Sequence, residues 1–98
     1  MPQKRLVLTN CDVIDPRDIE THLDRGGFRA LAKARNAMTP DEVIEVVKVS
    51  GLRGRGGAGF NCGAKWQLAS KAEGDEKFLI CNADEGEVGT FMDRFILA

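Results

Sequence analysis

The sequence predicts an α/β fold in which helices surround short buried strands. Two observations carry this prediction: helical segments with capping signals and one apolar face, and two short apolar runs at residues 5–9 (RLVLT) and 77–82 (KFLICN). Helices separated by short buried strands are typical of a layered α/β domain. The chain has 98 residues, of which 43% are hydrophobic and 30% charged, as expected for one small folded domain.

The first part of the chain carries signals for two helices. Asp15 and Pro16 predict a helix start, with Asp15 as the N-cap and Pro16 at the first helical position. Gly26-Gly27 predicts the end of this helix, whose apolar positions are Ile19 and Leu23. A second helix is expected over roughly 28–37, and its inward positions are Phe28, Leu31, Ala32 and Ala34.

Three further helices are expected downstream. Thr39 and Glu42 have the spacing of a capping box and predict a helix start, and Gly51 predicts the end of that helix. The next helix is expected over 65–71. Thr90 and Asp93 predict a last capped start, followed at once by the apolar residues Phe95, Ile96 and Leu97. Because this helix has barely begun, we expect the chain to be truncated at residue 98, and the alternative is a short C-terminal helix docked on the core.

Charge and composition exclude several functional classes. A net charge of −1 gives no general attraction to nucleic acid or anionic membrane. No apolar run approaches the roughly 18 residues of a membrane span, so we expect no membrane insertion. The first residues lack a signal-peptide core, which favours the cytoplasm. The spacings of Cys11, Cys62 and Cys81 match no disulfide framework or zinc motif, so no metal site is predicted.

Residues 51–60 (GLRGRGGAGF) place five glycines and two arginines in ten positions. Residues 54–59 match G-x-G-x-x-G, but a predicted helix precedes them instead of a strand, which excludes an ordinary Rossmann fold. The phosphate-loop pattern also fails, because Trp66 follows Lys65 where Ser or Thr is required. An RNA-binding RGG segment is a weaker alternative, since such segments are usually repetitive.

Physical chemistry favours a ligand-binding loop at this stretch. Glycines let backbone N–H groups approach an anion or a flat ring without interference from Cβ atoms. Arg53, Arg55 and Lys65 add positive charge, and Phe60 and Trp66 offer flat faces that can stack on a base. The alternative is a glycine-rich turn in a tight corner of the core.

An acidic stretch follows the second apolar run. Residues 82–87 (NADEGE) leave the carboxyl end of the predicted strand, the edge at which α/β sheets bind ligands. The amide of Asn82 can donate and accept hydrogen bonds, and the carboxylates can accept them from a ribose or a ring nitrogen. A solvated acidic turn is an equally open alternative.

Two long motifs, GLRGRGGAGF…GAKW and CNADEGEVGTFMDR, resemble the NADH-binding flavoprotein subunit of respiratory complex I. The family that they resemble includes the diaphorase subunits of NAD(P)-linked [FeFe] and bidirectional hydrogenases and of NAD-dependent formate dehydrogenases. The similarity is close over residues 51–66 and 81–94. The stretch 10–34 also resembles this family, and it is more similar to the hydrogenase-associated members.

The resemblance implies an NAD(P)H dehydrogenase flavoprotein subunit, in which FMN accepts hydride and passes electrons to an iron–sulfur cluster or partner subunit. It implies FMN and NAD(H) or NADP(H) as cofactors and iron–sulfur electron-transfer subunits as partners. It implies no catalytic side chain, because the chemistry belongs to the cofactor. The family's [4Fe–4S] ligands are not among the three cysteines of this chain.

Matching positions then carry the family's cofactor contacts. The resemblance places Gly54, Arg55, Gly56 and Gly57 along the FMN, with Asn82, Asp84 and Glu85 in contact with it. It places Lys65 near the flavin and the nucleotide, Phe60 on the adenine, and Glu87 in a hydrogen bond with the nucleotide.

The sequence departs from the family pattern at a few positions. Asn61-Cys62 replaces Pro-Thr, which we expect to loosen the loop and to put a thiol beside the site. Leu68 replaces a frequent aromatic residue, Val88 a proline and Met92 a lysine.

We therefore expect two parts in the chain. Residues 1–50 hold an N-terminal strand and helices. Residues 51–98 hold part of an FMN/NADH-binding domain, with a glycine-rich loop (51–66) and an acidic loop (81–94). The resemblance leaves open whether this chain is an enzyme by itself, and the alternative is a non-catalytic nucleotide- or partner-binding module.

Overall fold

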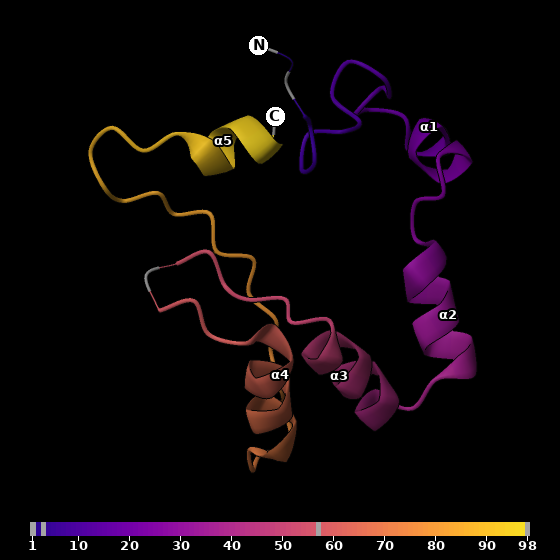
Figure 1. Cartoon of the computed structure of the whole chain (residues 1–98), viewed down its shortest axis with the longest axis vertical. Coiled ribbons are helices and arrows are strands. Elements are labelled where there is room, and N and C mark those ends of the chain that lie inside the picture. The colour runs from indigo at the N-terminus through magenta and orange to yellow at the C-terminus, as the bar shows by residue number, and fades with distance from the viewer. Residues whose placement is uncertain (1, 3, 57, 98) are drawn as a thin grey trace. The chain divides into compact units, whose positions relative to one another are not determined.

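The computed structural model describes residues 2, 4–56 and 58–97 of the chain. Within these residues the regular secondary structure is helical, apart from one isolated β-bridge between Arg53 and Asn61. The helices, drawn in Figure 1, are α1 (Ile19–Asp24), α2 (Arg29–Ala37), α3 (Pro40–Val49), α4 (Cys62–Lys71) and α5 (Met92–Leu97). They fall into two units, a terminal unit (Met1–Gly27 with Phe78–Ala98) and a central unit (Phe28–Lys77).

The central unit contains α2, α3 and α4. Helix α2 covers nearly the whole predicted range, with Phe28 as its N-cap residue. The capping box of α3 is confirmed: Thr39 Oγ1 accepts from Glu42 N at 3.3 Å, and the Glu42 carboxylate accepts from Thr39 N at 2.7 Å. Gly51 follows the end of α3 with φ +71°, a left-handed conformation that glycine adopts without strain.

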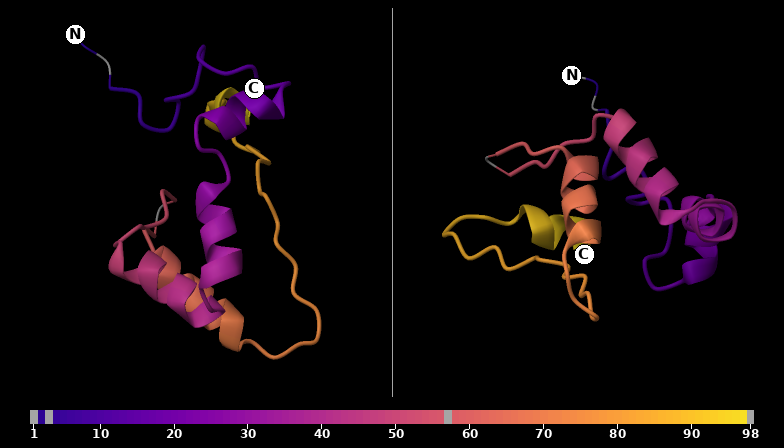
Figure 2. Two further views of the ribbon diagram at one scale, coloured as in Figure 1. Left: turned by 90° about the vertical axis from the view of Figure 1, so that its right-hand side faces the viewer. Right: turned by 90° about the horizontal axis from the view of Figure 1, so that it is seen from below.

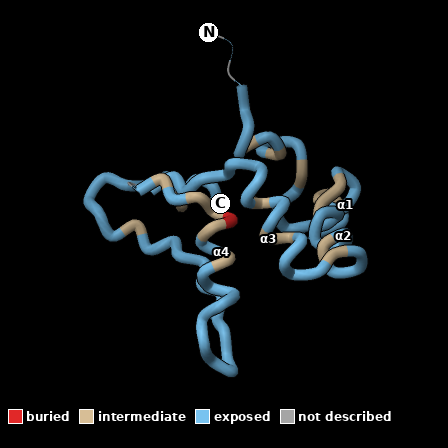
Figure 3. The backbone as a smooth tube through the Cα atoms, turned by 60° about the horizontal axis from the view of Figure 1, so that its bottom comes forward, coloured by how far each residue is buried: buried red, intermediate tan, exposed pale blue. Residues whose placement is uncertain are grey.

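Helix α4 begins at Cys62, three residues before the predicted start at Lys65. The reason is a cap: the side chain of Asn61 accepts a hydrogen bond from Ala64 N at 2.9 Å. Helices α3 and α4 lie against each other (Figure 2). Gly63, at this contact, is the one residue in the described ranges that is fully buried (Figure 3).

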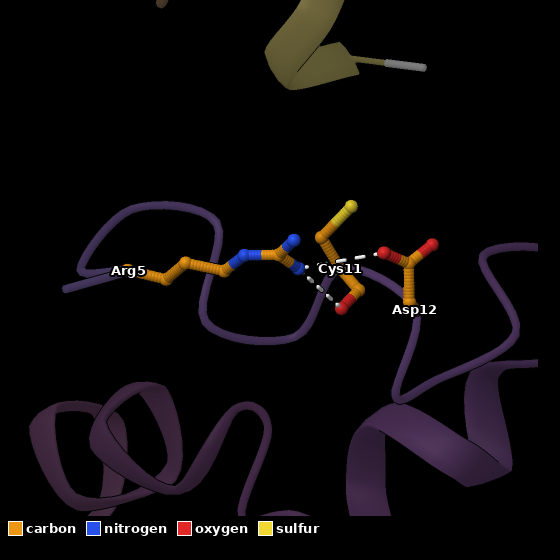
Figure 4. Close-up of polar contacts among 3 residues, drawn as sticks. All are labelled: Arg5, Cys11 and Asp12. Carbon is orange, nitrogen blue, oxygen red and sulfur yellow. Dashed lines mark hydrogen bonds and ion pairs between the residues drawn. The ribbon is translucent and has the colours of Figure 1, made fainter. Parts of the chain in front are cut away.

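The terminal unit begins with turns where the sequence predicts a strand. A bend and consecutive turns occupy residues 6–14, so the expected strand at 5–9 does not form. Local contacts hold this segment: Arg5 Nη1 donates to Cys11 O at 3.3 Å and pairs with Asp12 Oδ2 at 3.4 Å (Figure 4). A strand gains its hydrogen bonds only from a neighbouring strand, and the described residues offer none to this segment.

The caps of α1 and α5 differ from the prediction. Helix α1 begins at Ile19 because Asp18, not Asp15, accepts the capping bond from Glu20 N at 3.0 Å. The Asp15 carboxylate instead accepts from Arg17 N at 2.9 Å, in the turn before the helix. At α5, Thr90 is not the N-cap, because the carboxylate of Glu85 accepts from Asp93 N and Arg94 N.

Apolar side chains of the chain remain largely uncovered. The run 77–82 is assigned to neither helix nor strand, and Phe78, Leu79 and Ile80 are 83%, 101% and 81% exposed. No hydrophobic side chain in the described part of the chain is fully buried. A strand at 77–82 therefore stays a prediction, since it requires a partner strand that the described residues do not supply.

None of the described helices is both long enough and apolar enough to cross a membrane.

Candidate functional site

The glycine-rich loop is closed at its base by a short antiparallel pair. Gly54 N donates to Phe60 O at 2.9 Å, and Cys62 N donates to Leu52 O at 2.9 Å. These two bonds bracket Arg53 and Asn61, which form the isolated bridge. In such a non-hydrogen-bonded pair the two side chains lie especially close. Asn61 and Cys62 thus lie at the closed base of the loop, and a loosening of the loop relative to Pro-Thr stays a prediction.

The glycine-rich loop runs out from α3 and returns to α4 (Figure 1). Gly59 N donates to Gly56 O at 3.1 Å, and Gly59 has φ +54°, which the turn requires. A Cβ atom at Gly56 would meet no atom of the described residues within 4 Å. Packing among the described residues thus gives no reason for a glycine at position 56, which argues against the tight-corner alternative there. Gly57 lies outside the described residues.

Cationic side chains flank the base of this loop. Arg53 stands opposite Asn61, and Lys65 lies one helical turn beyond Asn61, since Lys65 N donates to Asn61 O at 3.1 Å. Helical side chains lean toward the helix N-terminus, so Lys65 leans toward the loop. Within the described ranges the one ion pair joins Arg5 to Asp12, so Arg53, Arg55 and Lys65 have no carboxylate partner there. Their charge is available to an anion.

The two predicted aromatic faces occupy different places. Phe60 lies in the loop and is 52% exposed, so its ring is available for stacking. Trp66 instead lines a shallow apolar groove of about 500 Å³, formed with Val43 and Ile44 of α3 and with Met38, which follows the end of α2. Of the two aromatic rings, Phe60 is therefore the candidate stacking surface, because Trp66 faces the groove beside α3.

The acidic loop is organised by its own hydrogen bonds. Asn82 Oδ1 accepts from Asp84 N at 3.1 Å, and Thr90 Oγ1 donates to Glu87 O at 2.7 Å. Glu85 is half-buried, and its carboxylate is bonded to amides of α5. The carboxylates of Asp84 and Glu87 are exposed and accept no hydrogen bond in the described part of the chain. Asp84 and Glu87 are thus the carboxylates of this loop that are free to accept from a ligand.

The structure gathers the predicted residues into two groups. Gly54, Arg55, Gly56, Phe60 and Lys65 lie in the central unit, whereas Asn82, Asp84, Glu85 and Glu87 lie in the terminal unit. Cys62 is the first residue of α4 and is half-buried, and Cys11 and Cys81 are exposed. The described residues contain no group of three His, Cys, Asp or Glu side chains placed to hold a metal ion.

Asn61 was missed as a structural part of this site. The signal that would have found it is an asparagine directly before a helical segment, a preferred N-cap residue.

The glycine-rich loop fits a phosphorylated ring compound such as FMN. Open backbone at Gly56 lets a ligand approach the main chain, and the amide N–H groups of Arg55 and Gly56 have no partner among the described residues. The cations at its base suit a phosphate group.

Comparison with known proteins supports this fit. The family model described as the Nuo51 FMN-binding domain matches residues 47–98, which include both loops. A subunit of NADH-quinone oxidoreductase from Rhizobium meliloti is 55% identical over 92 residues, which cover 94% of this chain and 22% of that protein. The HndC subunit of an NADP-reducing hydrogenase from Solidesulfovibrio fructosivorans is 50% identical over 95 residues, covering 97% of this chain and 19% of that protein.

A third relative extends the comparison to Escherichia coli. It is also a subunit of NADH-quinone oxidoreductase, and it is 42% identical over 80 residues, which cover 81% of this chain and 18% of that protein. The chain thus spans about a fifth of the length of these curated relatives, at 22%, 19% and 18%. Two kinds of named subunit thus match more than nine tenths of the chain. The quinone oxidoreductase subunit covers 94% of it and the hydrogenase subunit covers 97%.

Proposed function

Since the chain belongs to the Nuo51 FMN-binding domain family, we propose that it supplies part of the FMN and nicotinamide-dinucleotide sites of an NAD(P)H-oxidising flavoprotein subunit. When bound, FMN would supply the hydride-accepting chemistry and the release of single electrons toward an iron–sulfur cluster or partner subunit. The side chains of this chain then have binding and positioning roles.

The observation that carries this proposal is the open backbone at Gly56 beside cations that lack a carboxylate partner in the described ranges. With no partner among the described residues, the amide N–H groups of Arg55 and Gly56 can donate to phosphate or ring oxygens. Arg53 and Lys65 add a positive potential at the base of the loop, which favours the phosphorylated form of the flavin. The exposed ring of Phe60 provides the stacking face for the adenine of the dinucleotide.

The acidic loop supplies acceptors in this proposal. Asp84 and Glu87 accept hydrogen bonds from hydroxyl groups of the flavin side chain and of the dinucleotide ribose. The NH₂ group of Asn82 donates to the flavin, because its oxygen already accepts from Asp84 N. Glu85 contributes chiefly by fixing the start of α5, which shapes the end of the loop.

The proposal also covers the fold around this site. We propose that residues 77–82 form a buried strand of an α/β domain once a partner strand covers the exposed side chains.

The relatives are named as subunits, so iron–sulfur electron-transfer subunits are the proposed partners, in the cytoplasm or at the cytoplasmic face of a membrane complex. Any [4Fe–4S] cluster would take its ligands from elsewhere, because the three cysteines here form no metal-binding group among the described residues.

NADH oxidation by the natural protein, followed with an artificial electron acceptor, tests this proposal. Lys65→Ala and Glu87→Ala should raise the KM for NADH about tenfold, because each removes one charged contact. Lys71→Ala and Glu73→Ala are matched controls outside the two sites and should leave KM unchanged. Wild-type KM in both site variants would remove these residues from the dinucleotide site. Flavin binding without any NADH oxidation would favour a non-catalytic binding module.

A further inference from the structure

Asn61 connects the glycine-rich loop to the packed pair of helices α3 and α4. Its side-chain oxygen accepts from Ala64 N at 2.9 Å, in a partly buried hydrogen bond that caps α4. Its backbone oxygen accepts from Lys65 N at 3.1 Å, and Arg53 is its partner in the bridge across the loop. One residue therefore fixes the base of the loop, the start of α4 and the place of both cations.

We propose that Asn61 is a positioning residue for the flavin, an inference that rests on the proposed function. By capping α4, Asn61 holds the loop base in place, so that Arg53 and Lys65 flank the open backbone around Gly56. Asn61 itself need not touch the cofactor, because it acts through these neighbours.

The physical reason lies in the entropy of the loop. Glycine loses more conformational freedom on ordering than any other residue, so a glycine-rich loop that is mobile before binding lowers the affinity for its ligand. The base of this loop is a single bridge with the bonds Gly54 N to Phe60 O and Cys62 N to Leu52 O. So short a pairing is marginally stable by itself. Asn61 belongs to this pairing and also caps α4. It therefore anchors the base of the loop to the helix and lowers the mobility of the loop before binding.

The backbone at Asn61 allows the side chain to be tested separately. Its φ of −62° and ψ of 123° are ordinary extended values, so alanine or serine can replace it without backbone strain. Serine retains an oxygen that can cap α4, whereas alanine has none. Asn36 in α2 is a matched asparagine with no side-chain hydrogen bond in the described part of the chain, and Asn36→Ala serves as the control.

The test is an FMN titration of the flavin-free natural protein, combined with NADH oxidation at saturating FMN. Asn61→Ala should bind FMN about fivefold more weakly, which corresponds to about 1 kcal/mol, the usual effect of losing an N-cap. Asn61→Ser should restore FMN affinity to within about twofold of wild type. The kcat at saturating FMN should stay unchanged in both variants, and Asn36→Ala should match wild type throughout.

Two results would overturn the role of Asn61 while leaving the proposed function intact. One is wild-type FMN affinity in Asn61→Ala, and the other is an Asn61→Ser variant as weak as Asn61→Ala. If wild-type protein binds no FMN, the proposed function fails, and the flavin role of Asn61 fails with it. Amide exchange at Gly54 and Cys62 would still show whether Asn61 holds the loop, since Asn61→Ala should accelerate it and Asn61→Ser should not.

Discussion

Gly63 of α4 lies directly against the backbone of Lys48 in α3. A Cβ atom at position 63 would be 2.6 Å from Lys48 Cβ and nearer still to the Lys48 main chain. Side chains do not approach that closely, so this helix crossing requires glycine. Because the glycine-rich loop connects these two helices, the contact sets the frame from which the loop extends.

Substitution of Gly63 should separate the two helices. Gly63→Ala should lower the local stability of α4 by about 1–3 kcal/mol, the usual range for overpacking, despite the higher helix propensity of alanine. Hydrogen–deuterium exchange of residues 62–71 in the natural protein measures this loss. Unaltered exchange in α4 would show that the crossing can accommodate a methyl group.

Gly56→Ala also replaces a glycine by alanine, but at a position that the described residues leave open. Since none of their atoms lies within 4 Å of the added methyl group, exchange in α3 and α4 should match wild type. The methyl group would occupy space in which the flavin is proposed to approach the backbone, so FMN affinity should fall at least about tenfold. Equal FMN affinity would place the cofactor away from position 56.

We expect Glu85 to contribute more to the stability of the start of α5 than to the binding of FMN. Glu85→Ala removes the acceptor for Asp93 N and Arg94 N, so the protection of α5 against amide exchange should fall by about 1 kcal/mol in free energy. Glu85→Gln keeps an acceptor oxygen and should retain most of the protection. Glu87→Ala is the matched control, because its carboxylate accepts no bond in the described chain. A Glu85→Ala variant with wild-type exchange in α5 would contradict this role.

Local signals made part of this fold predictable. The capping box of Thr39 and Glu42 lies within four consecutive residues, so its chemistry is visible in the sequence and is confirmed at 3.3 and 2.7 Å. The cap of α5 was predicted wrongly because Glu85 reaches it from eight residues before Asp93. No local pattern indicates that such a carboxylate will turn back onto the helix.

Strands and glycines show where the sequence alone is insufficient. An apolar run such as 77–82 becomes a strand only with a partner, and the described residues provide none, so its expected pairing stays a prediction. Gly56 and Gly63 look alike in the sequence. The structure distinguishes them, because a side chain at Gly63 would collide with Lys48 whereas one at Gly56 would meet open space.

For the candidate site, the sequence predicted the family, whereas the cofactor contacts of the named residues stay predictions. Motifs at 51–66 and 81–94 indicated a flavin and dinucleotide site, and the family match over 47–98 confirms the resemblance. The part of Asn61 was missed, since the helix was expected to begin only at Lys65 and the bridge to Arg53 forms only in the folded loop.

The most direct measurement is a titration of the flavin-free natural protein with FMN, followed by the quenching of flavin fluorescence. We expect saturable binding that weakens at least about tenfold in Asn82→Ala and Asp84→Ala, because each variant would lose one of the proposed hydrogen bonds to the flavin. Circular dichroism of each variant checks that it is folded. A folded wild-type protein that binds no FMN, or site variants that bind it as tightly as wild type, would contradict the claim that these loops form the flavin site.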